Sequence, residues 1–295
     1  MALHTTAMAT VNRIYPFSIQ RLSDVAGAEI SGVDLRDPIS AEMRDAILAA
    51  LEEFHVIAFR DQNLTKDEQQ AFTLHFGEIE GHVGRLKSGE KYPIVHTVTN
   101  LDERTGLPTE TPTTHGNYFW HTDKSYHDVP SLLTMLHAIR TPPEGGDTLF
   151  ANMLMAYEAL PDAEKQALDG MRAAHSWEAN RLNTGNTPAS EEQKRERPPV
   201  SHPIVRTHQN GRKSLYLGVH IGHVEGMDYE AGRAMLADLL ERATAERFVY
   251  RHAWKVGDLT LWDNRVLVHR ADRNYEMTAH PRVLHRTVVR GVVPV

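Results

Sequence analysis

The first third of the chain shows clear helical and strand patterns. Residues 26–35 alternate apolar with small or polar side chains, as a half-buried strand does. Residues 40–54 repeat apolar positions at helical spacing, and residues 55–62 form another strand-like run. The predicted apolar stripe of the helix consists of Met43, Ile47, Leu48, Leu51 and Phe54.

A second helix is predicted after this strand. Thr65 and Glu68 have the spacing of a capping box, and Gly77 is placed to end the helix. The pattern of residues 1–114 therefore predicts a mixed α/β edge region.

The pattern changes from about residue 115. Short apolar or alternating runs, separated by Gly, Pro, Asn and Asp, predict many short strands of a sandwich or barrel. Helical patterns interrupt them at 156–171 and 229–244, and the polar, Pro-rich stretch 182–199 predicts a flexible loop or lid. We therefore predict a mainly β fold with added helices, a single domain over residues 1–295 whose jelly-roll core spans 115–295.

Composition narrows the class of protein. The 295 residues contain no Cys, which excludes disulfides and thiolate chemistry and favours a reducing cytoplasm. We see no secretory signal in "MALHTTAMATVNRIYPF" and no apolar run long enough for a membrane span. A net charge of −7 argues against a general nucleic-acid binder. We expect a protein that acts on a small molecule and has no nucleic-acid or membrane partners.

The stretch "FWHTDKSYHD" (119–128) holds the first candidate chemistry. His121 and Asp123 are two apart, so in a strand both side chains would point to one face, as two metal ligands could. With 18 His and 39 acidic residues, chance alone gives roughly two His-x-Asp/Glu pairs, and the chain has two. The pair is therefore weak evidence alone, and the other, His223/Glu225 in a Gly-flanked turn, is not expected to bind metal.

A distant histidine strengthens the metal hypothesis. His269 lies in an alternating strand after an Asp263-Asn264 turn, and could complete a triad of two His and one carboxylate, the site of non-heme Fe(II) oxygenases. If the co-substrate is 2-oxoglutarate, its far carboxylate needs an arginine and usually a hydroxyl. Arg282 and Arg286 are four apart in a strand-like run, which in a strand would put both on one face, and Thr148 is expected on a strand just after a Gly-Gly turn.

Several motifs together resemble one family. The pieces "WHTDKSY", "PPEGGDTLF", "AYEALP", "HPIVRTH", "GRKSLYLG", "GDLTLWDNRVLVHRA" and "RVLHRT" occur in the order found in the taurine/2,4-dichlorophenoxyacetate dioxygenases, which use Fe(II) and 2-oxoglutarate. The resemblance covers nearly the whole chain. It implies a double-stranded β-helix, Fe(II) with 2-oxoglutarate and O₂ as co-substrates, and a homo-oligomer, which family members commonly form.

The resemblance also implies roles for individual residues. The iron ligands would be His121, Asp123 and His269, and the 2-oxoglutarate C5 carboxylate would bind Thr148 and Arg282. Around the primary substrate, the resemblance implies Arg286 for its anionic group, and Asn117, His82 and His220 nearby. One departure is the separation of 13 residues between His269 and Arg282, about two longer than the family pattern, with "EMTAHP" as the expected insertion.

The resemblance implies hydroxylation of a small organic anion coupled to decarboxylation of 2-oxoglutarate. The stretches "YLGVHIGHVEGM" and "ATAERFVYRHAWKVGDL" are similar to the phenoxyacetate branch, so we expect an aryloxyalkanoate, released as a phenol and glyoxylate. Taurine, other sulfonates and alkyl sulfates form the alternative substrates. A zinc hydrolase with the same ligands and a non-catalytic, ligand-binding jelly roll are the alternatives from other classes.

Overall fold

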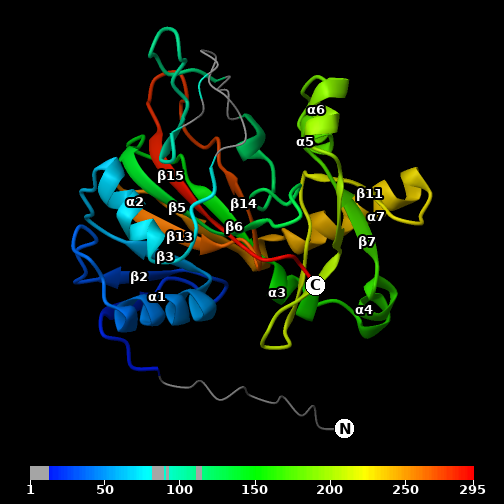
Figure 1. Cartoon of the computed structure of the whole chain (residues 1–295), viewed down its shortest axis with the longest axis horizontal. Helices are drawn as coiled ribbons and strands as arrows, with labels where there is room; N and C mark the ends of the chain where they lie inside the picture. The colour runs from blue at the N-terminus through cyan, green and yellow to red at the C-terminus, as the bar shows by residue number, and fades with distance from the viewer. Residues whose placement is uncertain (1–12, 82–89, 91–92, 111–114) are drawn as a thin grey trace.

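The computed structural model describes residues 13–81, 90, 93–110 and 115–295 (Figure 1). Over these ranges the chain forms fifteen strands and seven α-helices in several sheets. The fold is therefore mixed α/β, and the prediction of a mainly β chain gave too little weight to the helices. The division into one domain stays a prediction.

A seven-stranded sheet forms the centre of the molecule. Its order is β1-β2-β3-β13-β5-β15-β4, and all neighbours are antiparallel except the parallel pair β2 and β3. The bounds along that order are Ser18–Arg21, Ala28–Ser31, Val56–Phe59, Leu259–Asp263, Ser131–Arg140, Val283–Arg290 and His96–Thr99. The predicted edge region thus adds β1, β2 and β3 to one side of the sheet and β4 to the other.

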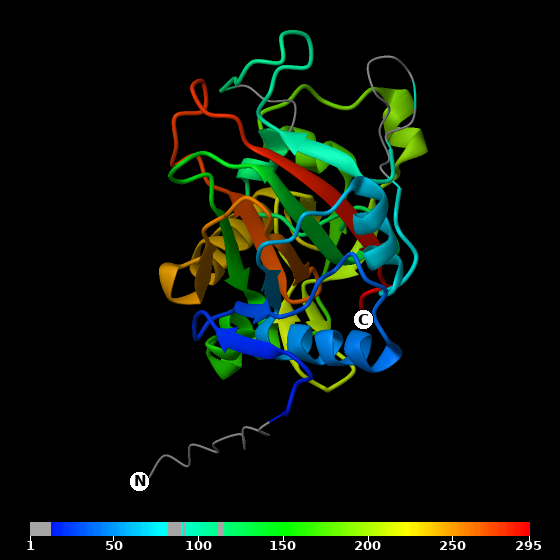
Figure 2. The same ribbon diagram turned by 90° about the vertical axis from the view of Figure 1, so that its left-hand side faces the viewer.

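Two helices cover this sheet near its β1–β3 side (Figure 2). Helix α1 (Ala41–Phe54) is capped by Ser40 and buries Ile47, Leu51 and Phe54, as its apolar stripe predicted. Helix α2 (Lys66–Leu74) begins with the predicted capping box at Thr65 and ends three residues before Gly77. Their apolar faces share one core with β3, β5 and β13.

A three-stranded sheet packs against the large one. Its order is β12-β6-β14, with bounds Val249–His252, Thr148–Asn152 and Leu267–Ala271. The core between the sheets includes Phe150 from the small sheet and Leu136, Trp262 and Leu284 from the large one. The candidate site lies between these two sheets.

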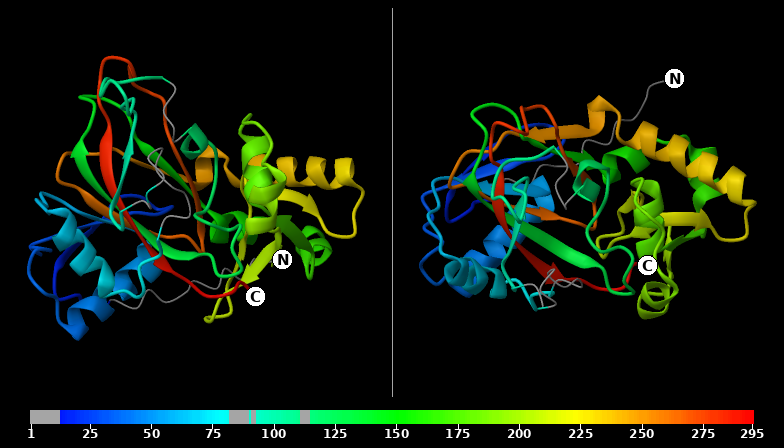
Figure 3. Two further views of the ribbon diagram at one scale, coloured as in Figure 1. Left: turned by 45° about the horizontal axis from the view of Figure 1, so that its top comes forward. Right: turned by 90° about the horizontal axis from the view of Figure 1, so that it is seen from above.

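The remaining elements gather at the opposite end of the molecule from α1 and α2 (Figure 3). Strands β9 (Val205–Thr207) and β10 (Lys213–Leu215) pair, while β11 (Ile221–Val224), β7 (Arg172–His175) and β8 (Val200–Pro203) form a third small sheet. Helices α3 (Met153–Glu158), α4 (Asp162–Leu168) and α7 (Tyr229–Ala243) bury a common core with these strands.

Two local predictions need correction. The helix expected over 156–171 is two helices, α3 and α4, because Pro161 between them has no N–H for a continuous helical ladder. The stretch 182–199 is not a plain loop: it contains the end of α5 (Trp177–Asn183) and all of α6 (Glu191–Glu196), which begins with a Ser190/Gln193 capping box. The helix predicted over 229–244 is confirmed as α7. Two short 3₁₀ helices, η1 (His115–Tyr118) and η2 (Glu246–Phe248), complete the elements.

The described helices do not include one that could span a membrane: none combines sufficient length with sufficient apolar character.

Candidate active site

His121 and His269 are joined by the backbone. His121 forms an isolated antiparallel bridge with His269 of β14, in which each residue donates its N–H to the other's carbonyl, at 3.0 and 2.7 Å. This bridge brings the two imidazole rings to 4.2 Å between centroids. Two residues 148 positions apart in the chain lie side by side because the backbone at His121 pairs with the edge of β14.

Asp123 completes a cluster with these two histidines. Its Oδ1 lies 3.8 Å from His121 Nε2, and its Oδ2 lies 3.9 Å from His269 Nε2. All three side chains are buried, and among the described residues this is the one group of three or more His, Cys, Asp or Glu that could hold a metal. His121 is a single bridge residue and Asp123 begins a turn, so the side chains converge at the end of a sheet and not within a regular strand.

The charges of the cluster suit metal binding. Burial lowers the pKa of His121, and it lowers that of His269 well below the usual value, so both rings are neutral. Burial alone would raise the pKa of Asp123, but the Arg286 guanidinium and the hydrogen bond from Thr134 hold that pKa well below its usual range. Two neutral imidazoles and one carboxylate are the protonation states that a metal requires of its ligands.

The local contacts also leave ligand atoms available. The Phe119 carbonyl, which can only accept, lies 2.7 Å from His121 Nδ1, so Nδ1 carries the proton and Nε2 keeps its lone pair. The buried Nδ1 of His269 has no hydrogen-bond partner among the residues that the structure describes. A 2-His-1-carboxylate donor set that presents Nε2 and carboxylate oxygens fits a non-heme Fe(II) ion.

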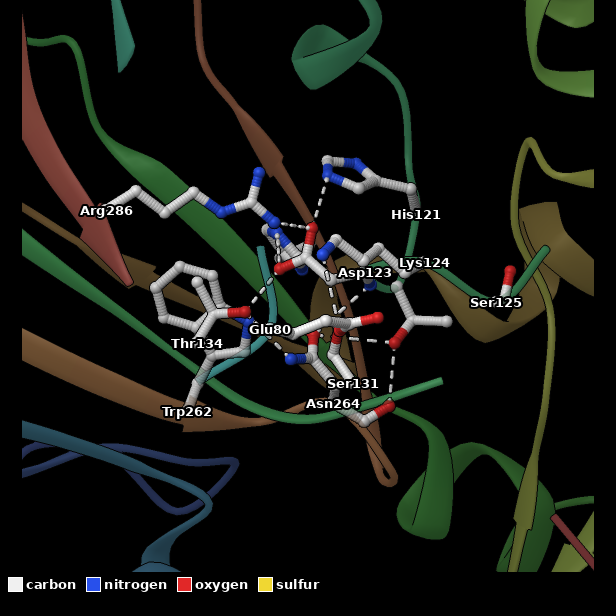
Figure 4. A network of polar contacts seen from close by, with 12 residues as sticks. Glu80, His121, Asp123, Lys124, Ser125, Ser131, Thr134, Trp262, Asn264 and Arg286 are labelled. Carbon is white, nitrogen blue, oxygen red and sulfur yellow. Dashed lines mark hydrogen bonds and ion pairs between the residues drawn. The ribbon is translucent and has the colours of Figure 1, made fainter. Parts of the chain in front are cut away.

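Two side chains contact the Asp123 carboxylate from different strands (Figure 4). Arg286 of β15 makes an ion pair with Oδ1 through Nη2, and the Thr134 hydroxyl of β5 donates to Oδ2. The resemblance implied that Arg286 faces a substrate; the structure also places it against Asp123, the carboxylate of the candidate metal cluster.

A small cavity adjoins the cluster. Its walls include the three cluster residues, Asn117 of η1, Thr148 of β6, and Arg282 and Arg286. Apolar side chains complete them: Val98, Leu136, Trp262 and Ala271. Most of the predicted site residues therefore come together around one space.

Arg282 and Thr148 form a prearranged donor pair at that cavity. Arg282 is only 7% exposed, its Nε donates to the Gly146 carbonyl at 2.7 Å, and its Nη2 donates to Thr148 Oγ1 at 3.3 Å. Trp254 Nε1 also donates to Thr148 Oγ1, at 3.0 Å, so the threonine hydrogen is free for another acceptor. Burial lowers the pKa of Arg282, which makes no ion pair with a carboxylate in the described part of the chain. The pair can therefore receive an incoming carboxylate.

The other predicted substrate residues divide into two cases. His220 is buried next to the cluster, with its ring 6.2 Å from that of His121 and its Nδ1 2.9 Å from Ser125 Oγ, but it does not line the cavity. Burial lowers its pKa to about 3, so the ring is neutral. His82 lies outside the described residues. His223 and Glu225, which were not expected to bind metal, are both exposed and separate from the cluster.

Sequence reasoning missed three contacting residues. Thr134 and Asn264 support Asp123, and Trp254 supports Thr148. Asn264 was noticed only as part of a turn, and Thr134 and Trp254 stand in apolar runs that predict strands and nothing more. Their roles depend on contacts between distant segments.

Comparisons with known proteins agree on one family. The model of the family described as "Taurine catabolism dioxygenase TauD, TfdA family" matches residues 18–288. An α-ketoglutarate-dependent 2,4-dichlorophenoxyacetate dioxygenase of Cupriavidus pinatubonensis is 40% identical over 281 residues, covering 92% of this chain and 97% of that protein. An α-ketoglutarate-dependent sulfate ester dioxygenase of Pseudomonas putida is 29% identical, covering 99% and 96%.

A solved structure agrees with these matches. The crystal structure of AAD-2 in complex with Mn(II) and N-oxalylglycine superposes with a TM-score of 0.84 at 36% identity, covering 94% of this chain and 98% of that one. Since the family model spans nearly all of the chain and the buried His-Asp-His cluster lies within the match, the chain belongs to the TauD, TfdA family and is an α-ketoglutarate (2-oxoglutarate)-dependent dioxygenase.

Proposed function

We propose that this enzyme hydroxylates a small aryloxyalkanoate, such as a phenoxyacetate, next to its ether oxygen. One oxygen atom of O₂ enters the substrate C–H bond and the other enters succinate as 2-oxoglutarate loses CO₂. The hydroxylated product is a hemiacetal, which collapses to a phenol and glyoxylate. The observation that carries this proposal is the 40% identity, over nearly the full length of both chains, to a 2,4-dichlorophenoxyacetate dioxygenase.

In this proposal His121, Asp123 and His269 hold Fe(II). Their burial, neutral rings and ionised carboxylate support the assignment. When bound, iron together with 2-oxoglutarate supplies the activation of dioxygen, the chemistry for which such sites leave open positions. The protein's own part is to position both organic acids and to exclude water around them.

Arg282 and Thr148 bind the far carboxylate of 2-oxoglutarate. Arg282 offers a buried guanidinium, and Thr148 offers a hydroxyl whose oxygen already accepts from Trp254 and Arg282. A carboxylate that reaches both would form charge-assisted hydrogen bonds in a site with little water.

Arg286 binds the anionic group of the primary substrate. It lines the same cavity as Arg282, which immediately precedes β15 and lies four residues before Arg286. Asn117 on the cavity wall and His220 beside His121 are the proposed neighbours of the organic part, with His82 as a further candidate. Because Arg286 already contacts Asp123, its charge is shared between the metal ligand and the substrate.

A sulfate ester or sulfonate is the alternative substrate class. The Pseudomonas putida relative, named for sulfate esters, matches this chain along almost all of its length, although at 29% identity. A guanidinium suits carboxylate and sulfate alike, so Arg286 does not separate the two classes. The two alternative hypotheses, a zinc hydrolase and a non-catalytic ligand-binding jelly roll, are excluded because the chain belongs to a dioxygenase family.

The test is a substrate panel. Purified enzyme with Fe(II), ascorbate and 2-oxoglutarate is given phenoxyacetates, phenoxypropionates, taurine, alkylsulfonates and alkyl sulfates, and succinate is measured for each. We expect the highest kcat/KM with a phenoxyacetate or phenoxypropionate. A sulfate ester or sulfonate with a higher kcat/KM than every aryloxyalkanoate would contradict the proposed substrate class. It would still agree with hydroxylation that depends on 2-oxoglutarate.

We also infer that the two facing sheets are the double-stranded β-helix. The bridge of His121 to β14 supports this, because it adds a fourth strand position to the small sheet opposite β13, β5, β15 and β4. The predicted homo-oligomer and cytoplasmic location stay predictions.

A further inference from the structure

We propose that Thr134 and Asn264 are positioning residues that fix the orientation of the Asp123 carboxylate, so that Oδ1 is its metal-binding oxygen. This inference rests on the proposed role of Asp123 as an iron ligand. The three residues come from β5, from the turn after β13 and from the segment after the His121 bridge. Figure 4 shows them meeting in one polar network.

The network is almost completely removed from water. Thr134 is 0% exposed, Asn264 2% and Asp123 4%. In such surroundings each hydrogen bond has few competing partners, and an unpaired polar group is costly. The directions of the bonds can therefore be worked out from the groups that can only donate.

Two such donors determine the orientation of the Asn264 amide. Trp262 Nε1 lies 3.2 Å from Asn264 Oδ1, and the backbone N–H of Asp123 lies 3.3 Å from the same oxygen. Neither group can accept a hydrogen bond, so the oxygen of the Asn264 amide must face them. The amide nitrogen Nδ2 then faces Thr134 Oγ1, at 2.9 Å.

The orientation of Asn264 in turn determines that of Thr134. Since Nδ2 can only donate, Thr134 Oγ1 is the acceptor in that bond. The one hydroxyl hydrogen of Thr134 is left for Asp123 Oδ2. The chain of donors therefore runs from Trp262 through Asn264 and Thr134 to one oxygen of the carboxylate.

The sheet and the turn hold this chain of donors in place. Thr134 and Trp262 are directly paired across β5 and β13 and so lie on one face of the sheet. The backbone of Asn264 is held as well, because its N–H donates to the Leu132 carbonyl and its carbonyl accepts from the Thr122 hydroxyl at 2.7 Å. Asn264 and Thr134 therefore hold Asp123 through its backbone N–H and through Oδ2.

This arrangement gives the two carboxylate oxygens different roles. Oδ2 accepts the Thr134 hydrogen bond and lies 3.9 Å from His269 Nε2, whereas Oδ1 lies 3.8 Å from His121 Nε2 and makes the ion pair with Arg286. A metal ion bound at Oδ1 would take the place of that ion pair, whereas the donor chain through Thr134 would remain on Oδ2. With Oδ2 held, the carboxylate does not turn to offer both oxygens to Arg286 as a two-pronged ion pair. Thr134 and Asn264 thus keep Oδ1 in the position where it can bind metal.

The test measures Mn(II) affinity apart from turnover. Free Mn(II) is followed by electron paramagnetic resonance in titrations of the full-length protein, and the Tm of the metal-free protein is measured in parallel. The variants are Thr134→Val, which keeps the shape and removes the hydroxyl; Thr134→Ser, which restores it; and Asn264→Asp, which cannot donate to Thr134. Thr73→Val is the matched control, since Thr73 is also 0% exposed and its hydroxyl is hydrogen-bonded in the core, to Thr287 at 2.8 Å.

We expect Thr134→Val and Asn264→Asp each to weaken Mn(II) binding about ten- to a hundredfold, the usual effect of losing a residue that supports a metal ligand. Thr134→Ser should bind within a fewfold of wild type, and Thr73→Val should bind like wild type while losing as much Tm as Thr134→Val. The variant that combines Thr134→Val with Asn264→Asp should bind Mn(II) only slightly more weakly than Asn264→Asp alone, because both changes break the same chain of donors.

Two results would overturn the proposal. One is Thr134→Val with wild-type Mn(II) affinity; the other is a loss of affinity that Thr134→Ser does not restore. His269→Ala in the same titration separates this proposal from the assignment of the metal site. If that variant binds Mn(II) like wild type, the proposed metal site itself is wrong; if it loses binding while Thr134→Val does not, only the positioning role is wrong.

Discussion

At the scale of single residues, the site combines one candidate metal cluster with two arginines that we propose bind anions. His121, Asp123 and His269 are buried with the charges that ligands need. Arg282 faces a threonine and a carbonyl, whereas Arg286 faces a carboxylate that belongs to the metal cluster. The two arginines line one cavity but differ in their partners, so their loss should have different effects.

Replacing any one of the three cluster residues should abolish turnover. His121→Ala, Asp123→Ala and His269→Ala each remove one of the three proposed protein ligands, and we expect succinate formation to fall to background while circular dichroism stays native. Glu225→Ala, an exposed change in the other His-x-Glu pair, should act like wild type. Near-normal succinate production by any of the three alanine variants would exclude that residue as a ligand.

Arg282→Ala should raise the KM for 2-oxoglutarate much more than the KM for the primary substrate. Losing a charge-assisted pair costs about 1.5–3 kcal/mol, or roughly ten- to a hundredfold in affinity. Arg282→Lys should recover only part of this, because an ammonium lacks the planar fork of donors. Initial-rate kinetics with each substrate varied in turn measure both constants, and an equal rise in the two would refute the assignment.

Arg286→Ala should weaken the binding of the anionic primary substrate and leave the binding of 2-oxoglutarate unchanged. The binding of 2-oxoglutarate to the Fe(II) enzyme can be followed without oxygen by its weak visible absorption band. A neutral ester of a good aryloxyacetate should be a poor substrate for wild type, and the variant should discriminate less between acid and ester. Equal turnover of acid and ester by wild type would contradict an anionic substrate.

At the scale of elements, the site depends on how β6, β14 and β15 meet. The turn before β6 carries Gly145 and Gly146, both at positive φ, and the Gly146 carbonyl accepts from Arg282. A Cβ at Gly146 would lie 2.7 Å from Pro142 Cγ and 3.3 Å from Arg282 Cδ. The glycine therefore allows the arginine to approach the backbone closely.

Gly146→Ala should accordingly raise the KM for 2-oxoglutarate. Its control is Gly211→Ala, since Gly211 has a similar φ of +78° but no atom within 4 Å of an added Cβ. Both variants should lose some stability from backbone strain, which urea unfolding measures. Only Gly146→Ala should weaken the binding of 2-oxoglutarate. If the two variants raise this KM alike, the close approach to Arg282 has no functional effect.

Local pattern predicted elements well where one segment determines its own structure. The helices α1, α2 and α7 follow from apolar periodicity and caps, and the metal cluster follows from the resemblance together with the distant His269. The pattern did not reveal the contact of Arg286 with Asp123 or the support from Thr134, because both join strands that are far apart in sequence. The break at Pro161 was visible in the sequence but was outweighed by the helical residues around it.

At the scale of the whole molecule, burial of neutral histidines makes the fold sensitive to acid. Burial lowers the pKa of His55 to about 4, and its neighbours Asp263 and Arg212 act in opposite directions on it. In the unfolded chain this histidine has its ordinary pKa near 6.5 and takes up a proton first as pH falls. The free energy of unfolding should therefore decrease between about pH 6.5 and 4.

His55→Asn should reduce that dependence on pH. Asn tolerates the left-handed conformation of this position, where φ is 63°. Because one titrating group contributes at most about 1.4 kcal/mol per pH unit, the variant should lose up to that much of the slope. Urea unfolding at several pH values between 4 and 7 measures the slope, and identical slopes for the two proteins would show that His55 does not contribute.

The reaction as a whole is tested most directly by its stoichiometry. Phenol and succinate are measured together as wild-type enzyme consumes a phenoxyacetate in the presence of Fe(II), 2-oxoglutarate and air. We predict one phenol and one succinate for each substrate molecule, with no phenol when 2-oxoglutarate is left out. Succinate that accumulates without phenol, at a rate that the phenoxyacetate does not increase, would contradict the proposed hydroxylation.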